Sequence, residues 1–337
     1  MTDVALIACD HGLGHVRRCA LVAEALSERG ASVTLLAPRD AVARVRRGLG
    51  IDTTAVTDVE FRTHTSAAAL RAGDARTTRW EQRLPDLGGF DRVVADTLPE
   101  VLAVRPDTVL LAQFVWHEVL DGVDATYRAR AAALLDTATT IVGDDLFAMP
   151  ALRERQGFVG VGRYVPATVG PPTSPPSTLL VSGGTTPAVV APLRRLVAAL
   201  QDVGPGPFRR VVVDGELAPS GPPPWMEVAG HDRRMYDDVA LAVVRPGLGV
   251  LSELVARGVP AWCAREPGNA ELAHNAAAVS GSDLGRDLGT VPGGTDAVER
   301  WAADVAATAV AAGTAGWRPT GAGPTDGAAA AARTVLA

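Results

Sequence analysis

The stretch from residue 239 to residue 276 constrains the fold more than any other part of the chain. An apolar run at 239–244 leads into the glycine-containing turn 245–249, and apolar residues then recur at helical spacing. Gly258 ends that helix, because glycine readily adopts the left-handed conformation that helix ends favour, and a second apolar run occupies 259–264. A strand, a glycine turn, a helix and another strand in this order predict a parallel, doubly wound sheet.

The same stretch carries residue types that suit a phosphorylated nucleoside. The turn points backbone N–H groups and a helix N-terminus beyond the sheet edge, which favours a phosphate. Glu253 sits six residues after Gly247, where a carboxylate can take both hydroxyls of a ribose. A polar turn containing Asn269 follows the second strand, and a helix carrying Asn275 opens near Glu271. The alternative is an ordinary crossover whose glycines only form the turn.

The spacing R-x-G-x-x-x-x-x-E, then G-x-P and an Asn-Ala helix, resembles the donor site of the GT-B glycosyltransferases. The resemblance is strongest to the branch that contains the cell-wall N-acetylglucosaminyltransferase MurG and the antibiotic and plant UDP-glycosyltransferases. It implies that the glycine loop meets a diphosphate, the glutamate a ribose and the polar residues the donor sugar; these positions are Gly247, Gly249, Glu253, Asn269 and Glu271. Many members carry glutamine-rich sequence before Asn-Ala, whereas this chain has Glu-Leu-Ala-His there.

The N-terminus predicts a second unit of the same kind. An apolar run at 4–9 ends in a loop containing Gly12 and Gly14, a helical pattern follows, and another apolar run lies at 33–36. This resembles the start of a dinucleotide-binding fold, but the third glycine is missing and the second strand is followed by Arg39 instead of an acid. Arg39 leaves NADP open as an alternative.

His15, at the end of this loop, is the expected catalytic base. In the family named above, the corresponding loop ends in a histidine that removes the proton from the acceptor hydroxyl. By the same resemblance, Gly14 and Arg18 are expected to contact the acceptor. The string G-x-G-H-x-x-R also matches the nucleotide-sugar hydrolase of pseudaminic acid synthesis, in which water replaces the acceptor. A purely structural histidine is the alternative.

Asp96 is the expected partner of His15. It ends an apolar strand at 90–96, and a carboxylate there can reach across a parallel sheet to the first loop. In many UDP-glycosyltransferases an aspartate holds the catalytic histidine in this way; a helix cap near Pro99 is the alternative. A further strand runs into Trp116 and His117, which are candidates for contacts with the acceptor if they are exposed. Core packing is the favoured interpretation of Trp116, and His117 is a second candidate base.

The second half of the chain follows a proline-rich linker at 166–177. We expect an acceptor-binding domain at 1–165, a nucleotide-sugar donor domain at 178–318, and a tail at 319–337 that returns to the first domain. The resemblance implies an α/β GT-B fold of two doubly wound Rossmann-like domains facing a central cleft. It also assigns phosphate, base and diphosphate contacts of the donor to Gly183, Gly184, Thr185, His231 and Arg245.

Composition excludes several other kinds of chemistry. None of the 32 basic residues is lysine, so Schiff-base chemistry and a lysine-dependent P-loop are ruled out. The three cysteines are widely separated, which favours core packing over a metal pair or disulfides. A net charge of -6 argues against nucleic-acid binding. The absence of a long apolar run or a signal-peptide pattern predicts a cytoplasmic protein without integral membrane contact.

The resemblance implies an inverting glycosyltransferase in which His15, oriented by Asp96, activates a small-molecule acceptor. No Asp-x-Asp motif occurs, so we expect neither a metal nor a cofactor, only a nucleotide-sugar co-substrate of the UDP or dTDP type. Backbone N–H groups, assisted by Arg245 or Arg18, would then stabilise the charge of the departing diphosphate. The alternatives are a nucleotide-sugar hydrolase and a non-catalytic nucleotide-sugar sensor; the N-terminal signature of the related epimerases is missing. A monomer or a homodimer is expected.

Overall fold

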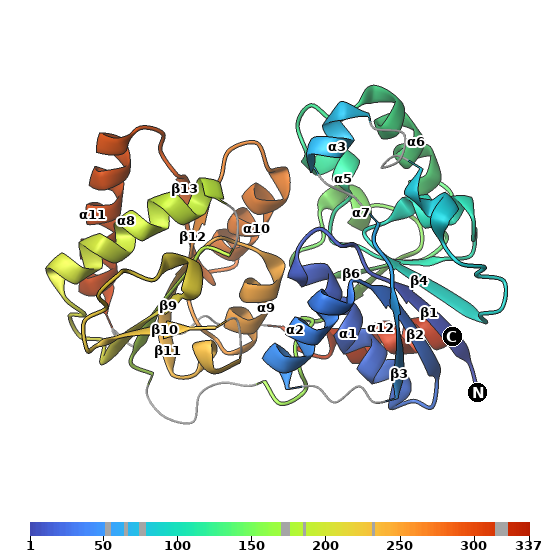
Figure 1. The fold of residues 1–337 in the computed structure, drawn as a ribbon, viewed down its shortest axis with the longest axis horizontal. Coiled ribbons are helices and arrows are strands. Elements are labelled where there is room, and N and C mark those ends of the chain that lie inside the picture. The colour runs from blue at the N-terminus through green and yellow to red at the C-terminus, as the bar shows by residue number, and fades with distance from the viewer. Residues whose placement is uncertain are drawn as a thin grey trace. The chain divides into compact units, whose positions relative to one another are not determined.

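The computed structural model divides the chain into two compact units, one of residues 1–167 with 324–337 and one of residues 168–323 (Figure 1). The division falls inside the stretch 166–177, and the tail from Pro324 belongs to the first unit. The residues that the structure describes are 1–50, 55–63, 67–73, 79–169, 176–184, 187–230, 233–313 and 323–337.

The first unit is built on a seven-stranded parallel sheet with the order β3-β2-β1-β4-β5-β6-β7. The strands are β1 (Asp3–Ile7), β2 (Ser32–Ala37), β3 (Val56–Glu60), β4 (Arg92–Asp96), β5 (Val109–Leu111), β6 (Ile141–Asp144) and β7 (Phe158–Val161). The chain runs outward from β1 to one edge and then returns to β4 on its other side. β1 and β4 therefore flank the point where the strand order reverses, which is where ligands of doubly wound sheets bind.

Helices of the first unit surround this sheet. They are α1 (Leu13–Ser27), α2 (Arg39–Leu49), α3 (Ala67–Ala72), α5 (Trp116–Val119), α6 (Ala125–Leu135), α7 (Pro150–Arg153) and α12 (Gly327–Leu336), with 3₁₀ turns η1 (Trp80–Arg83) and η2 (Pro99–Ala103). The C-terminal helix α12 packs beside α1 (Figure 1). Its buried face consists largely of alanine, including Ala331 and Ala332, and such small side chains allow two helices to approach closely.

The second unit repeats the plan with a six-stranded parallel sheet of order β10-β9-β8-β11-β12-β13. Its strands are β8 (Thr178–Ser182), β9 (Arg210–Asp214), β10 (Met226–Ala229), β11 (Val239–Val244), β12 (Ala261–Arg265) and β13 (Gly285–Thr290). Its helices are α8 (Pro187–Val203), α9 (Leu248–Ala256), α10 (Ala270–Gly281) and α11 (Thr295–Ala312), with 3₁₀ turns η3 (Gly215–Leu217) and η4 (Arg233–Tyr236). Here β8 and β11 flank the reversal of strand order.

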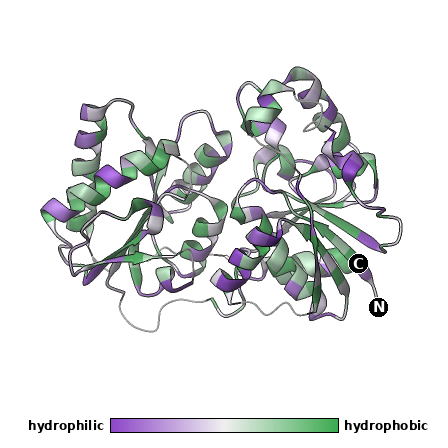
Figure 2. Ribbon diagram, in the orientation of Figure 1, coloured by the Kyte–Doolittle hydropathy of each residue, from purple (hydrophilic) through white to green (hydrophobic). Residues whose placement is uncertain are grey.

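Central strands of both sheets are mainly apolar, as Figure 2 shows. β11 is buried at all six positions, because strands covered by helices on both faces have no polar side. Three strands that the sequence patterns did not reveal, β3, β7 and β13, each lie at an end of a sheet. Their partial exposure interrupts the apolar run that identifies a central strand. No helix among the described residues has both the length and the apolar character needed to span a bilayer.

Candidate functional site

The loop after β1 sets His15 at the carboxyl edge of the first sheet. Gly12, which immediately precedes α1, has a φ of 88°, a backbone conformation that is strained for residues other than glycine. Gly14 is exposed in the first turn of α1, and His15 is the next residue. Because α1 starts directly above the reversal of strand order, His15 occupies the place where such sheets bind ligands.

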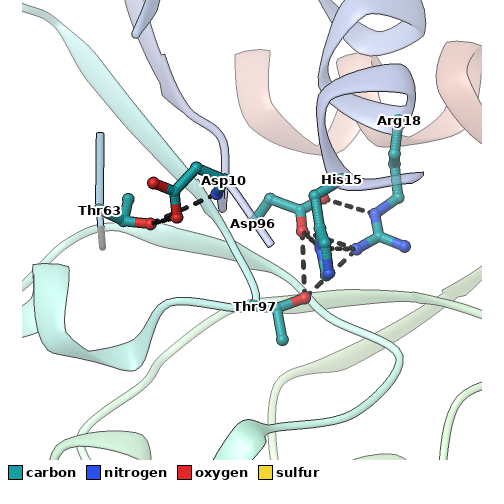
Figure 3. A network of polar contacts seen from close by, with 6 residues as sticks. All are labelled: Asp10, His15, Arg18, Thr63, Asp96 and Thr97. Carbon is teal, nitrogen blue, oxygen red and sulfur yellow. Dashed lines mark hydrogen bonds and ion pairs between the residues drawn. The ribbon is translucent and has the colours of Figure 1, made fainter. Parts of the chain in front are cut away.

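The structure brings His15 and Asp96 together (Figure 3). The Nδ1 atom of His15 lies 2.5 Å from Oδ1 of Asp96, which is the last residue of β4. Strands β1 and β4 are hydrogen-bonded neighbours, so the residues that follow one strand meet the end of the other. The Asp96 side chain is fully buried, whereas 9% of the His15 side chain remains exposed.

Arg18 is the second partner of Asp96, and this differs from the expected acceptor contact. Its Nε donates to Oδ2 of Asp96 at 2.6 Å and its Nη2 to Oδ1 at 2.7 Å, a bidentate pair. The residue is buried, with only 6% of its surface exposed. His15 and Arg18 are three positions apart on α1 and therefore share one helix face, so both reach the same carboxylate.

Thr97 completes the network and was not predicted. Its hydroxyl donates to Oδ1 of Asp96 at 3.0 Å and lies 3.2 Å from Nη2 of Arg18 (Figure 3). Its φ is 59°, in the left-handed region that a β-branched residue rarely adopts. Strain of this kind, of order 1–3 kcal/mol, clusters at functional sites. The sequence signal was only a hydroxyl residue following the acid at a strand end.

The carboxylate of Asp96 and the guanidinium of Arg18 each stabilise the charged form of the other. Burial by itself would raise the pKa of Asp96, but Arg18 and His15 outweigh burial and hold that pKa below its usual value. Burial likewise opposes the charge of Arg18, and Asp96 reverses the effect and raises the pKa of the guanidinium. Asp96 is therefore an anion and Arg18 a cation at neutral pH, and every polar atom of the carboxylate has a partner.

Aromatic rings surround His15 on the side of α5. The Phe114 and Trp116 rings lie 5.9 Å and 5.7 Å from the imidazole, and Trp116 also meets His11 edge-on at 4.8 Å. Trp116 and His117 are 5% and 3% exposed, which agrees with core packing of Trp116 and not with an exposed acceptor face. The short helix α5 turns both side chains inward.

His117 differs from His15 in its electrostatics. Burial, assisted by the cations Arg128 and Arg155, lowers the pKa of His117 to about 4. Its Nδ1 atom is buried and has no hydrogen-bond partner among the described residues. His117 is thus a neutral interior histidine, and the contact of its Nε2 with Glu118 measures 3.9 Å.

In the second unit, the glycine turn between β11 and α9 is held by Asn275. Gly247 is the N-cap of α9, and no side chain caps this helix start. The buried Asn275 amide donates to the Pro246 carbonyl at 3.0 Å, tying α10 to the turn. In the sequence, Asn275-Ala276 was notable only because it matches the family pattern. The structure adds that Asn275 holds the glycine turn in place through this hydrogen bond.

Two charged side chains of this unit are already paired. Arg245 donates to the Glu266 carboxylate from Nη2 at 2.6 Å and from Nε at 2.9 Å. Glu253, the expected ribose ligand, is fully buried in α9, and its Oε2 lies 3.4 Å from Nε of Arg257. The ribose contact of Glu253 stays a prediction.

The loop after β8 differs from the expected phosphate site. A single buried oxygen of Asp214, at the end of β9, accepts hydrogen bonds from the amides of Gly183 at 2.8 Å and Gly184 at 3.3 Å. The Ser182 hydroxyl donates to the same oxygen at 2.9 Å. The amides expected to meet a phosphate thus already bind a carboxylate.

The remaining expected donor contacts lie on the turns described above or outside the described residues. Asn269 caps α10, its Oδ1 accepting from the Leu272 amide at 3.4 Å. Glu271 and Gly249 are partly buried in the first turns of α10 and α9. Thr185 and His231 lie outside the described residues. Within the described part of the chain, no three His, Cys, Asp or Glu side chains are grouped to hold a metal ion.

No family model and no curated protein matches the sequence. Among solved structures, the chain is similar to the glycosyltransferase of kitacinnamycin, with a TM-score of 0.62, 16% identity, and coverage of 99% of this chain and 98% of the other. Arabidopsis thaliana UGT89C1, in complexes with quercetin and with UDP-L-rhamnose, gives 0.61 and 13%, covering 99% and 94%. The spinosyn rhamnosyltransferase SpnG with thymidine diphosphate gives 0.56 and 17%, covering 99% and 95%. These likenesses and the two doubly wound parallel sheets show that the chain has the α/β two-domain GT-B fold.

Proposed function

We propose that this chain is an inverting, metal-independent glycosyltransferase that moves a sugar from a nucleoside diphosphate to a small-molecule acceptor. The observation that carries the proposal is the contact between His15 and Asp96 at the strand-order reversal of the first unit. A histidine held by a buried carboxylate at a ligand-binding edge is the arrangement of a general base and the residue that orients it.

In the proposed reaction, Asp96 accepts the Nδ1 hydrogen of His15, so Nε2 is the basic nitrogen. Nε2 takes the proton of the acceptor hydroxyl, and the freed electron pair on oxygen forms the bond to the anomeric carbon of the donor. The bond from that carbon to the diphosphate oxygen breaks, and its electrons leave with the diphosphate. Attack from the face opposite the leaving group inverts the anomeric configuration. General-base assistance contributes roughly 10²- to 10⁴-fold to such a step.

The donor diphosphate is assigned to the turn between β11 and α9. The positive end of the α9 dipole favours an anion at this turn, and Asn275 fixes the turn through its hydrogen bond to the Pro246 carbonyl. The Arg245 guanidinium lies at the same turn and is paired with Glu266. To bind the diphosphate, Arg245 has to exchange the Glu266 carboxylate for a phosphate oxygen. Gly183 and Gly184 are left out of the diphosphate site, because their amides bind Asp214.

The named neighbours support UDP or dTDP as the nucleotide. One solved neighbour is a complex with UDP-L-rhamnose and another with thymidine diphosphate, and a third complex holds quercetin. These ligands favour a small hydroxylated molecule as the acceptor here. Hydrolysis of the nucleotide sugar uses the same base with water in place of the acceptor, and one assay separates the two activities.

The test is turnover of UDP-, dTDP- and GDP-sugars with and without a mixture of phenolic and aliphatic hydroxyl acceptors, followed by release of the nucleoside diphosphate. Glycosylated product of inverted configuration is expected, and free sugar released without any acceptor indicates the hydrolase. His15→Ala should lower turnover about 10²- to 10⁴-fold while calorimetric affinity for the nucleoside diphosphate is unchanged. His117→Asn is the matched comparison, and loss of turnover in that variant alone would transfer the role of base to His117.

A further inference from the structure

Asp96 bonds to Arg18 and Thr97 as well as to His15, and the proposed reaction uses only the contact with His15. Its Oδ1 atom lies 2.5 Å from His15 Nδ1 and also accepts from Arg18 Nη2 at 2.7 Å, while Oδ2 accepts from Arg18 Nε at 2.6 Å. The two side chains are close neighbours, since Arg18 Nη2 lies 3.3 Å from His15 Nδ1. A histidine paired with a lone carboxylate has no such cation beside it.

We infer that Arg18 is a positioning residue that balances the charge of Asp96, so that His15 contacts a carboxylate–guanidinium pair without net charge. The inference rests on the proposed function in one respect, that His15 is the base. A permanent cation 3.3 Å from the imidazole opposes the imidazolium and favours the neutral form that a base requires.

Other ionisable groups around the network do not supply this balance. Cys19, one residue after Arg18, and Tyr164, whose ring lies 6.0 Å below the Arg18 guanidinium, are both buried. Burial raises the pKa of the Cys19 thiol and of the Tyr164 phenol, so both stay neutral. From α5, the lowered pKa of His117 keeps that side chain neutral as well. Arg18 is the cation in direct contact with Asp96 among the described residues, apart from His15 itself.

The geometry also gives Arg18 a mechanical role. Two parallel hydrogen bonds fix the plane of the carboxylate, and Thr97 bonds to both residues. With its plane fixed, Asp96 offers Oδ1 to His15 in one direction only, which orients the imidazole. A lysine at this position would keep the charge and lose the two-point grip.

The direct test is a nuclear magnetic resonance titration of ring-labelled histidine, which needs neither donor nor acceptor. The His15 signal is identified by its loss in His15→Gln. In Arg18→Met we expect protonation of the His15–Asp96 pair to move up by about one to three pH units, the range for a charge within about 4–6 Å. Arg18→Lys should restore the titration to near that of the wild type. An unchanged titration in Arg18→Met overturns the inference.

A matched control removes another bidentate arginine of the same unit. Arg46 donates two hydrogen bonds to Asp58, and Arg46→Met should leave the His15 titration unchanged. If Arg18→Met fails to fold, Arg18→Gln replaces it, because the glutamine amide can still donate to Asp96 without a charge. The same upward shift is expected there, and its absence counts equally against the inference.

Turnover separates this inference from the proposed function. If both hold, the midpoint of the acidic limb of the kcat/KM profile moves up by about one to three pH units in Arg18→Met. On the plateau, kcat falls in both Arg18→Met and Arg18→Lys. A merely structural role for Arg18 would lower the plateau without moving the limb. A shifted titration combined with unchanged turnover in His15→Gln overturns the proposed function and leaves the electrostatic role of Arg18 in place.

Discussion

Asp96→Asn is the substitution whose cost the structure specifies best. The change keeps the shape of the side chain and removes the charge that Arg18 and His15 share. The buried Arg18 guanidinium then loses two charge-assisted hydrogen bonds, of 2.6 Å and 2.7 Å. Removing one member of a buried ion pair costs about 3–5 kcal/mol, because the other charge stays buried without a counter-ion. We expect the unfolding free energy of the first unit to fall by that amount.

The effect should depend on pH in a defined direction. Arg18 and His15 overcome the effect of burial and hold the pKa of Asp96 below its usual value. A depressed pKa in the folded state gives stability that is complete above the unfolded-state value of about 4 and is lost as the pH falls through the lower folded-state value. The difference between the wild type and Asp96→Asn should therefore be constant above about pH 5 and shrink below about pH 4.

Hydrogen exchange under increasing urea, followed on peptides from α1 and β4, measures this difference. A single global midpoint is unsuitable, because the chain contains two units. Asp58→Asn is the control: it breaks another bidentate arginine pair, but about a quarter of each side chain is exposed there, so the loss should be about 1 kcal/mol or less. A loss below about 1 kcal/mol in Asp96→Asn, or a difference that grows towards low pH, would refute the reasoning.

Two further predictions concern buried side chains outside this pair. Asn275→Ala leaves the Pro246 carbonyl without its side-chain donor. The free energy of local opening of α9, measured by hydrogen exchange, should fall by about 1–3 kcal/mol. Calorimetry should show weaker binding of a nucleoside diphosphate. Unchanged exchange would mean that Asn275 does not hold the turn. Because the pKa of His117 is lowered to about 4, the unfolded chain binds a proton there that the folded chain does not, so stability falls by up to about 3 kcal/mol between about pH 6.5 and pH 4. His117→Phe should flatten that part of the stability curve of the first unit, measured by hydrogen exchange under urea, and an unaltered slope would assign the pH dependence to other groups.

The sequence determined the architecture and the positions of its loops. Buried parallel strands are continuous apolar runs, so the central strands, the glycine turns that follow them and the placement of His15 and Asp96 at strand ends were all predictable. The edge strands β3, β7 and β13 were not, because partial exposure makes their residues mixed in polarity. The pattern of apolar residues along a strand reflects how fully helices and neighbouring strands bury it, and burial is incomplete at the edge of a sheet.

Only the tertiary structure decided which groups meet. Asp96 is 81 residues from His15 and 78 from Arg18, and it reaches both because β4 pairs with β1. The capture of the Gly183 amide by Asp214 follows in the same way from the pairing of β9 with β8. Hydrogen-bond partners across a sheet depend on strand order, which periodicity along the chain does not encode. The sequence therefore placed the reactive side chains at the sheet edge, and packing chose their partners.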